Sequence, residues 1–195
     1  MRKWLAVAAV TVVAVAAVAG SAAARPQAGP TVVGVAASNK DFSTLVALVK
    51  AAGLAGALSN PNAQLTVFAP TNEAFKSLEA AVPGVTKALT DPMNKGLLVQ
   101  VLKYHVLGSK VMAAAAIAVA KQHGKVPTLL GKGAGGQIAL SLKGGKVALS
   151  DSAGLNTAIV TKTDIAASNG VVHVINKVLV PKSVAVALKK DGLIK

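Results

Sequence analysis

Few residues in this chain could do chemistry, and their spacing matches no common catalytic or metal-binding pattern. Three histidines, His105, His123 and His173, are separated by 18 and 50 residues, so no two of them lie one turn apart on a helix. The 195 residues include no cysteine that could complete a zinc site. Because His105 and His173 lie in apolar stretches, we expect them in the core and expect no metal centre.

Motifs for nucleophilic or acid–base catalysis are also missing. Neither G-x-S-x-G nor S-x-x-K occurs in the sequence. The seven acidic residues are too far apart to indicate a carboxylate pair: they are Asp41, Glu73, Glu79, Asp91, Asp151, Asp164 and Asp191. We therefore expect a protein that is not an enzyme, with no catalytic residues and no cofactor.

One formal match to a phosphate-binding motif fails on its context. Residues 131–136, GKGAGG, satisfy G-x-G-x-x-G. That motif requires a helix to begin directly after the glycines, and here a strand pattern begins at Gln137. We interpret the segment as a loop.

The first 24 residues predict a secretory signal peptide. Arg2 and Lys3 precede an apolar run over residues 5–19, and the small residues 22–24 fit a cleavage site before Arg25. The alternative is an uncleaved membrane anchor, but the run is shorter than the roughly 20 residues that span a bilayer. After cleavage no transmembrane anchor would remain. The expected location is outside the cell or at its surface, or the periplasm in a Gram-negative bacterium.

The net charge of +14 is compatible with an acidic partner, a polysaccharide, a nucleic acid or a membrane surface, and solubility alone also explains it. Lysines are scattered along the whole sequence, and aromatic residues make up 3% of it. Specific nucleic-acid recognition usually combines arginines with stacking aromatic side chains. We therefore expect no specific nucleic-acid binding, and a weak, salt-sensitive affinity for acidic polysaccharides.

The first half of the chain favours helices. Apolar residues recur at helical spacing between residues 42 and 52, with Asp41 near the expected start and Gly53 at the expected end. A short strand is predicted over residues 65–69, followed by a helix that Thr71 can cap. Asn94 can cap a further helix that ends near His105.

The second half favours antiparallel hairpins. Alternating apolar residues flank the turn at residues 143–146, KGGK, and again flank Asn169 and Gly170. Gly170→Val is expected to damage folding, because the turn would force a β-branched residue into a positive φ. Helices followed by hairpins predict an α+β fold.

Three segments carry a resemblance to the fasciclin (FAS1) domain family. They are LTVFAPTNEAF at residues 65–75, LKYHVL at 102–107 and NGVVHVINKVLVP at 169–181. The resemblance covers about residues 31–185. Two positions depart from the family pattern: Asn176 stands where an acidic residue is common, and Gly108 stands where proline often follows the Tyr-His segment.

The resemblance implies a FAS1-like wedge of two β-sheets flanked by helices, in secreted or surface proteins that mediate adhesion. With it we divide the chain into a signal peptide (1–24), a lead-in (25–36), a FAS1 domain (37–185) and a C-terminal tail (186–195). Binding would fall on the Tyr-His segment and the lysine beside it: Tyr104, His105, Val106, Leu107 and Lys110.

Two functional hypotheses remain open from the sequence. The first is an interaction module that meets an extracellular protein or an acidic polysaccharide. The second is a soluble carrier of an apolar small molecule such as a carotenoid, as in the single-domain algal FAS1 proteins that the chain resembles. Abundant small and aliphatic side chains with few aromatics are compatible with an apolar groove, although they also fill tight cores.

Overall fold

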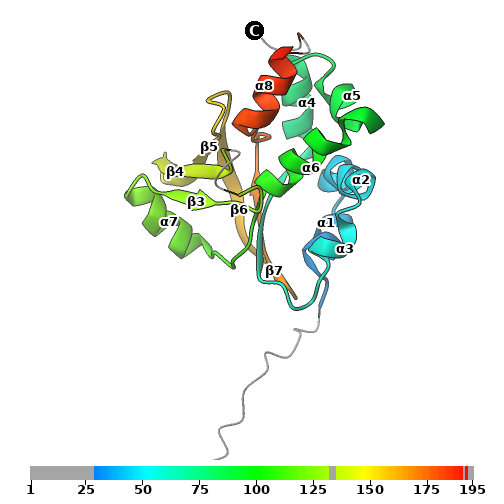
Figure 1. Cartoon of the computed structure of the whole chain (residues 1–195). Coiled ribbons are helices and arrows are strands. Elements are labelled where there is room, and N and C mark those ends of the chain that lie inside the picture. Colours follow the sequence, from blue (N-terminus) through cyan, green and yellow to red (C-terminus); the bar gives the residue numbers. More distant parts are fainter. Residues whose placement is uncertain (1–28, 132–134, 191, 193–195) are drawn as a thin grey trace, which may run out of the picture.

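The computed structural model describes residues 29–131, 135–190 and 192, which form a mixed β-sheet surrounded by helices (Figure 1). Its helices are α1 (Val32–Ala37), α2 (Ser43–Ala52), α3 (Ala55–Leu58), α4 (Asn72–Ala81), α5 (Val85–Thr90), α6 (Lys95–Tyr104), α7 (Ala113–Lys121) and α8 (Lys182–Lys190), with short 3-10 turns η1 (Lys40–Phe42) and η2 (Pro92–Asn94). The expected signal peptide at 1–24, the predicted cleavage point at Arg25 and residues 132–134 of the glycine-rich segment lie outside the described residues.

Seven strands follow the order β2-β1-β7-β6-β5-β4-β3. They are β1 (Leu65–Pro70), β2 (Val106–Leu107), β3 (Lys125–Pro127), β4 (Gln137–Lys143), β5 (Lys146–Ser150), β6 (Thr157–Ala167) and β7 (Gly170–Ile175). Strands β1 and β7 run parallel, and the other neighbours run antiparallel. The α+β fold class is therefore confirmed.

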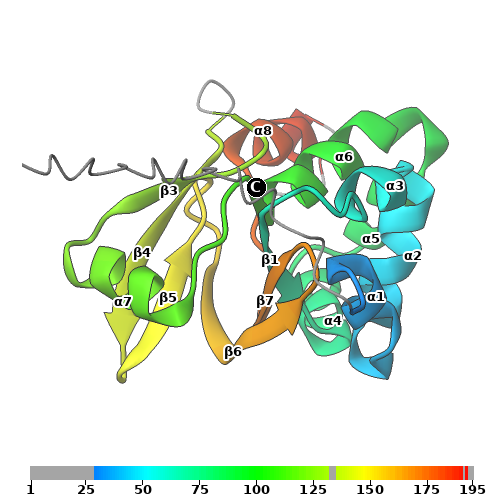
Figure 2. The ribbon, with the colours of Figure 1, turned by 90° about the horizontal axis from the view of Figure 1, so that it is seen from below.

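Strand β6 joins two sheets into a wedge. Its first residues, 157–159, pair with β5, whereas residues 160–167 pair with β7 through two shifts in register. Asp164 lies within the second shift with a φ of 57°, a left-handed backbone conformation that bends the strand. Figure 2 shows the β3–β4–β5 end turned away from β1 and β7, with α7 beside β4 and β5 and most other helices on the side of β1 and β7.

Two hydrophobic cores follow from this division. The larger core lies between β1, β7 and helices α1 to α6 and α8, and includes Phe42, Phe75 and Leu102. The smaller core lies inside the wedge and is built around Phe68 and Tyr104. The Tyr-His segment thus lies where the two cores meet.

The packed domain extends beyond residues 37–185 at both ends. Helix α1 lies in the segment assigned to the lead-in, and its Val32 and Ala36 belong to the larger core. Helix α8 continues to Lys190, and its Leu188 is buried. An apolar side chain on the inner face of each helix explains why these segments pack instead of trailing.

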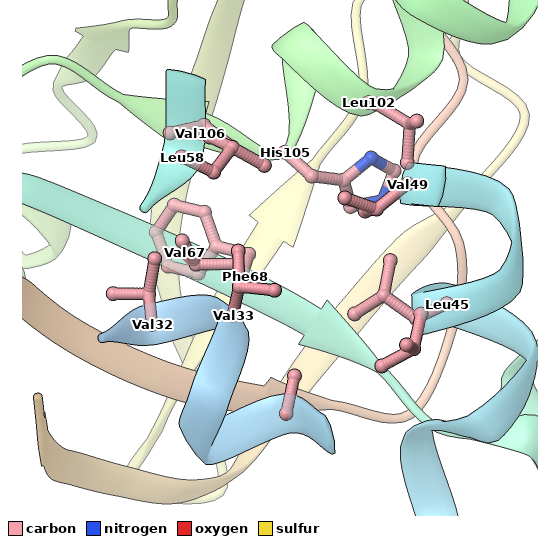
Figure 3. A pocket seen from close by; sticks show the side chains of 12 residues that line it. Val32, Val33, Leu45, Val49, Leu58, Val67, Phe68, Leu102, His105 and Val106 are labelled. Carbon is pink, nitrogen blue, oxygen red and sulfur yellow. The ribbon is translucent and has the colours of Figure 1, made fainter. Parts of the chain in front are cut away.

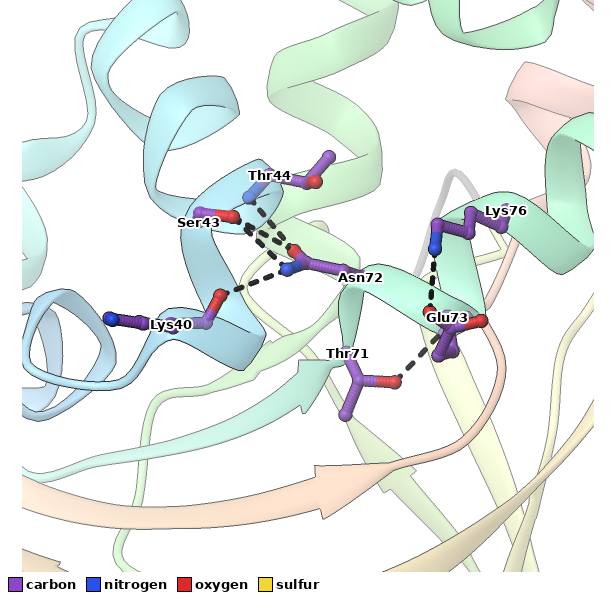
Figure 4. A network of polar contacts seen from close by, with 8 residues as sticks. Lys40, Ser43, Thr44, Thr71, Asn72, Glu73 and Lys76 are labelled. Carbon is purple, nitrogen blue, oxygen red and sulfur yellow. Dashed lines mark hydrogen bonds and ion pairs between the residues drawn. The ribbon is translucent and has the colours of Figure 1, made fainter.

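The N-terminus of α2 is capped from a distant position, and Asp41 does not cap it. Asn72 Oδ1 accepts a hydrogen bond from the Thr44 N–H (3.0 Å), and Asn72 Nδ2 donates to the Lys40 carbonyl (2.9 Å), as Figure 4 shows. The Asn39 side chain instead accepts from the Asp41 N–H and caps η1. Asn72 therefore locks α2 against the start of α4.

Other predicted helix ends are confirmed in part. Thr71 Oγ1 accepts from the Ala74 N–H at 3.3 Å and caps α4. Gly53 ends α2 with a φ of 74°, which glycine adopts without strain. Asn94 occupies the N-cap position of α6, but its side chain makes no capping hydrogen bond.

Both hairpins form, although the reason for Gly170 differs from the prediction. Gly144 and Gly145 have φ values of 56° and 75°, as a two-residue turn between β4 and β5 requires. Gly170 has no positive φ. It begins β7 beside β1, and a Cβ added there would lie 2.0 Å from the Leu65 carbonyl oxygen. Glycine is needed at this position because two backbones approach closely.

Candidate functional site

Tyr104 lies fully buried at the end of α6. Its hydroxyl donates to the Gln137 carbonyl (2.9 Å) and accepts from the Ser152 N–H (2.8 Å). Burial raises the pKa of this hydroxyl above its ordinary value. Tyr104 therefore connects α6 to the start of β4 and to the loop between β5 and β6.

His105 is also buried, and both of its ring nitrogens have partners inside the protein. Nδ1 donates to the Val101 carbonyl one turn earlier (2.8 Å), and Nε2 accepts from the Leu179 N–H (3.0 Å). This pattern requires the neutral tautomer with its proton on Nδ1. Burial lowers the pKa of His105 to about 4. The ring holds the segment after β7 against α6 and has no lone pair left for a metal.

Of the five residues predicted for partner binding, four are buried and one lies on the surface. Tyr104, His105, Val106 and Leu107 each have an exposed fraction of 3% or less. Lys110 is exposed. The four buried side chains position β2 against β1, so in the folded protein a macromolecule can contact the neighbouring loop and Lys110 rather than these side chains.

Sequence analysis missed the residues that hold this loop, which spans residues 108–112. Thr66 Oγ1, on β1, donates to the Ser109 carbonyl (2.7 Å) and accepts from the Val111 N–H (2.8 Å). His173 Nε2, on β7, donates to the Val111 carbonyl (2.9 Å). The buried threonine in an apolar strand was the available signal, because such a hydroxyl needs a partner.

His173 also holds the bend in β6. Its Nδ1 accepts from the Asp164 N–H (3.2 Å), and its ring stacks on Phe68 with the ring centroids 5.8 Å apart. The Asp164 carboxylate in turn accepts from the Ala113 N–H at the start of α7 (2.9 Å). His173 and Asp164 thus tie β7, β6 and α7 together, in accord with the core position expected for His173.

An apolar pocket opens between the first helices and β1 (Figure 3). Val32 and Val33 of α1, Leu45 and Val49 of α2, and Phe68 of β1 line it, with Val106 and the ring of His105 on the far side. The space between these side chains is about 450 Å³, part of it open solvent. The space that could hold whole water molecules is about 30 Å³, so the apolar side chains nearly fill the pocket.

The surface carries most of the charge. Every lysine that the structure describes is exposed. Among the described residues, Glu73–Lys76 is the one ion pair, with Nζ and Oε1 2.7 Å apart.

The described part of the chain contains no cluster of three or more histidine, aspartate or glutamate side chains placed to hold a metal ion. No described helix has the length and apolar character needed to cross a membrane.

The fasciclin domain model matches residues 40–181. The chain belongs to the fasciclin (FAS1) family. Protein sll1483 of Synechocystis sp. is 45% identical over 151 residues, which are 77% of this chain and 73% of that protein. The uncharacterized protein sll1735 of the same organism is 33% identical over 77% of this chain and 97% of its own length.

Animal FAS1 proteins are similar over one part of their length. Transforming growth factor-beta-induced protein ig-h3 of Sus scrofa is 38% identical over 77% of this chain, which spans 19% of that protein. The FAS1 domain pair from the insect cell adhesion molecule fasciclin I has the same fold, with a TM-score of 0.67 and 18% identity over 80% of this chain and 52% of that one. The predicted FAS1 fold is therefore confirmed by sequence and by structure.

Proposed function

We propose that this protein is a secreted, non-enzymatic FAS1 interaction module for adhesion at the cell surface or in the extracellular matrix. The solved FAS1 pair with the same fold comes from a cell adhesion molecule. The single observation that carries the proposal is that the buried polar groups are bonded within the fold, whereas the charged groups lie on the surface. Each described buried polar side chain has a hydrogen-bond partner, while the described lysines all face solvent.

The buried groups that resemble catalytic residues support a non-enzymatic role. His105, His173 and Tyr104 use their polar atoms on backbone groups of neighbouring elements. Asp151 does the same, accepting from the N–H groups of Leu155, Asn156 and Val180. A general base needs a free lone pair within reach of a substrate. Both ring nitrogens of His105 and His173 are already bonded, and Tyr104 and Asp151 are buried.

The charge supports an acidic partner, either an extracellular protein with an acidic face or an acidic polysaccharide. Sixteen described lysines stand against one ion pair, so their field reaches the solvent with little local compensation. Fields of this kind are screened beyond about 8 Å at physiological salt. The attraction therefore depends on ionic strength, and specific nucleic-acid recognition is not expected of it.

The test is binding of the mature chain, residues 25–195, to surfaces coated with an acidic polysaccharide, a neutral polysaccharide or an extracellular matrix protein. We expect binding to the acidic polysaccharide or the matrix protein and none to the neutral surface. Failure to bind any of them at low ionic strength would overturn the proposal. Sequencing the N-terminus of the secreted protein tests the location, because it should begin near Arg25.

The apolar pocket favours a second candidate function, the transport of an apolar small molecule such as a carotenoid. Its lining offers almost no polar group, because both nitrogens of His105 are already bonded. Protein isolated from its native source should then show a visible absorption band that co-elutes with it. Colourless protein that also fails to take up several carotenoids in vitro would leave the interaction module alone.

A further inference from the structure

A second pocket lies between α4 and the segment that links β7 to α8. Ser77, Leu78 and Ala81 of α4 form one side, and Asn156, Lys177 and Val178 form the other. Its space is about 300 Å³, part of it open solvent. It shares no lining residue with the apolar pocket, and none of the five residues predicted for partner binding lines it.

The helix creates this hollow because its side chains are small there. Ser77 and Ala81 are four residues apart and therefore lie one above the other on the same face of α4. Leu78 and Val178 are buried with exposed fractions of 7% and 1%, and together they give the pocket an apolar floor. Ser77 and Lys177 are exposed and Asn156 is half-buried, so the polar groups stand at the rim.

The far side of the pocket is held in place by Asp151. Its Oδ2 accepts from the Asn156 N–H (3.0 Å) and from the Val180 N–H (3.2 Å). Its Oδ1 accepts from the Leu155 N–H (2.9 Å). One buried carboxylate therefore fixes the loop that carries Asn156 to the segment that carries Lys177. A site fixed in this way loses little freedom when it binds a ligand.

The charge at the rim is positive. Lys177 has no carboxylate within 4.0 Å in the described part of the chain, because the one ion pair there joins Glu73 to Lys76. Lys177 is the one cation among the described residues that line the pocket, and its side chain is exposed. An exposed ammonium group with no acidic partner favours a carboxylate ligand.

We propose that this pocket binds a uronic-acid residue of an acidic polysaccharide. The sugar carboxylate meets Lys177 Nζ, its hydroxyls meet Ser77 Oγ and the Asn156 amide, and the C–H face of its ring lies on Leu78 and Val178. An acidic peptide side chain would meet the lysine alone, whereas a uronic acid also offers hydroxyl groups to Ser77 and Asn156. The inference rests on the proposed interaction function and names the partner class for it.

The experiment titrates the mature chain with trigalacturonate while amide NMR shifts are recorded. We expect shifts concentrated at residues 77–81, 156 and 177–178. Lys177→Gln should weaken binding by about fivefold or more, because a charge-assisted hydrogen bond is lost. Ala81→Leu should weaken it further by filling the hollow. Lys143→Gln, at the β4–β5 turn, removes the same charge outside the pocket and should change the affinity less than about twofold.

Ala81→Leu could fail to fold, so the test also uses Ser77→Ala and Lys177→Gln, which change exposed side chains. Amide spectra of these two variants away from the pocket should match the parent protein. Equal weakening by Lys177→Gln and Lys143→Gln, with shifts spread over the whole surface, would overturn the pocket while leaving the proposed adhesive function intact. A triglutamate peptide that bound more tightly at the same residues would overturn the sugar assignment. Loss of binding to every acidic polysaccharide and matrix protein would instead contradict the proposed function itself.

Discussion

The backbone N–H of Leu179 donates to Nε2 of His105 at 3.0 Å, across 74 residues of sequence. This contact requires a neutral imidazole, because a proton on Nε2 would face the N–H donor. The loop after β7 is thereby attached to the end of α6. The histidine of the Tyr-His segment is thus a structural residue whose neutral form the fold requires.

The first prediction is a loss of stability in weak acid. The pKa of His105 is about 4 in the folded chain against 6.5 in the unfolded chain, so the unfolded state binds more protons between these values. The contribution is complete above pH 6.5 and is lost as the pH falls toward 4, by about 3 kcal/mol in the free energy of unfolding. Urea unfolding at a series of pH values measures it.

The matched variant is His105→Gln, whose amide can accept from Leu179 but does not titrate. Asp151 changes the stability in the opposite direction. Burial raises its pKa, so its protonation as the pH falls favours the folded state. The difference between parent and variant removes this background. Identical pH profiles for the two proteins would contradict the assigned role of His105.

The second prediction concerns the approach of β7 to β1. Gly170→Ala should destabilise the protein by about 3 kcal/mol or more, because its Cβ would lie 2.0 Å from the Leu65 carbonyl oxygen. Gly96 in α6 has open space around its added Cβ. Gly96→Ala should therefore be neutral or stabilise by up to about 1 kcal/mol through helix propensity. The measurement is the melting temperature of each variant. Similar melting temperatures for Gly170→Ala and Gly96→Ala would refute the close packing of the two strands.

The third prediction concerns Asn169, which is fully buried. Its Oδ1 accepts from the Val32 N–H (2.9 Å), and its Nδ2 donates to the carbonyls of Leu58 (2.8 Å) and Asn60 (3.0 Å). Asn169→Ala leaves these backbone groups without partners and should lower the free energy of unfolding by about 2–4 kcal/mol. Asn62→Ala changes an exposed residue of the same type and serves as the control. A loss below about 0.5 kcal/mol for Asn169→Ala would contradict its role in holding α1.

The fourth prediction concerns the lysine surface. The protein should be retained on a heparin-like matrix at low ionic strength and released near or modestly above physiological salt, because exposed charges are screened. Lys110→Ala should move the release point little, since one of many scattered lysines contributes a small part of the field. If this substitution abolished retention, a localised site beside the Tyr-His segment would replace the diffuse field.

Local signals allowed much of the fold to be predicted. The two glycines at residues 144 and 145, the Thr71 cap and the Gly53 helix end depend on neighbours within a few residues. Asn72, Asn169 and Gly170 act on partners 28 to 137 residues away or on a parallel strand, which periodicity does not reveal. The burial of the predicted binding residues also depends on how the two cores meet. The composition was compatible with an apolar groove, but the positions of both pockets depend on the same long-range packing.

The most direct measurement of the central claim is fold-dependent attachment. Beads coated with the mature chain are applied to cells that secrete the protein and to their washed extracellular matrix, beside beads coated with Gly170→Val and beads without protein. We predict that the folded protein attaches the beads in a salt-dependent manner, whereas Gly170→Val, which has the same charge but cannot bring β7 against β1, attaches few. Equal attachment by all three kinds of bead, or by none, would contradict a role as an interaction module.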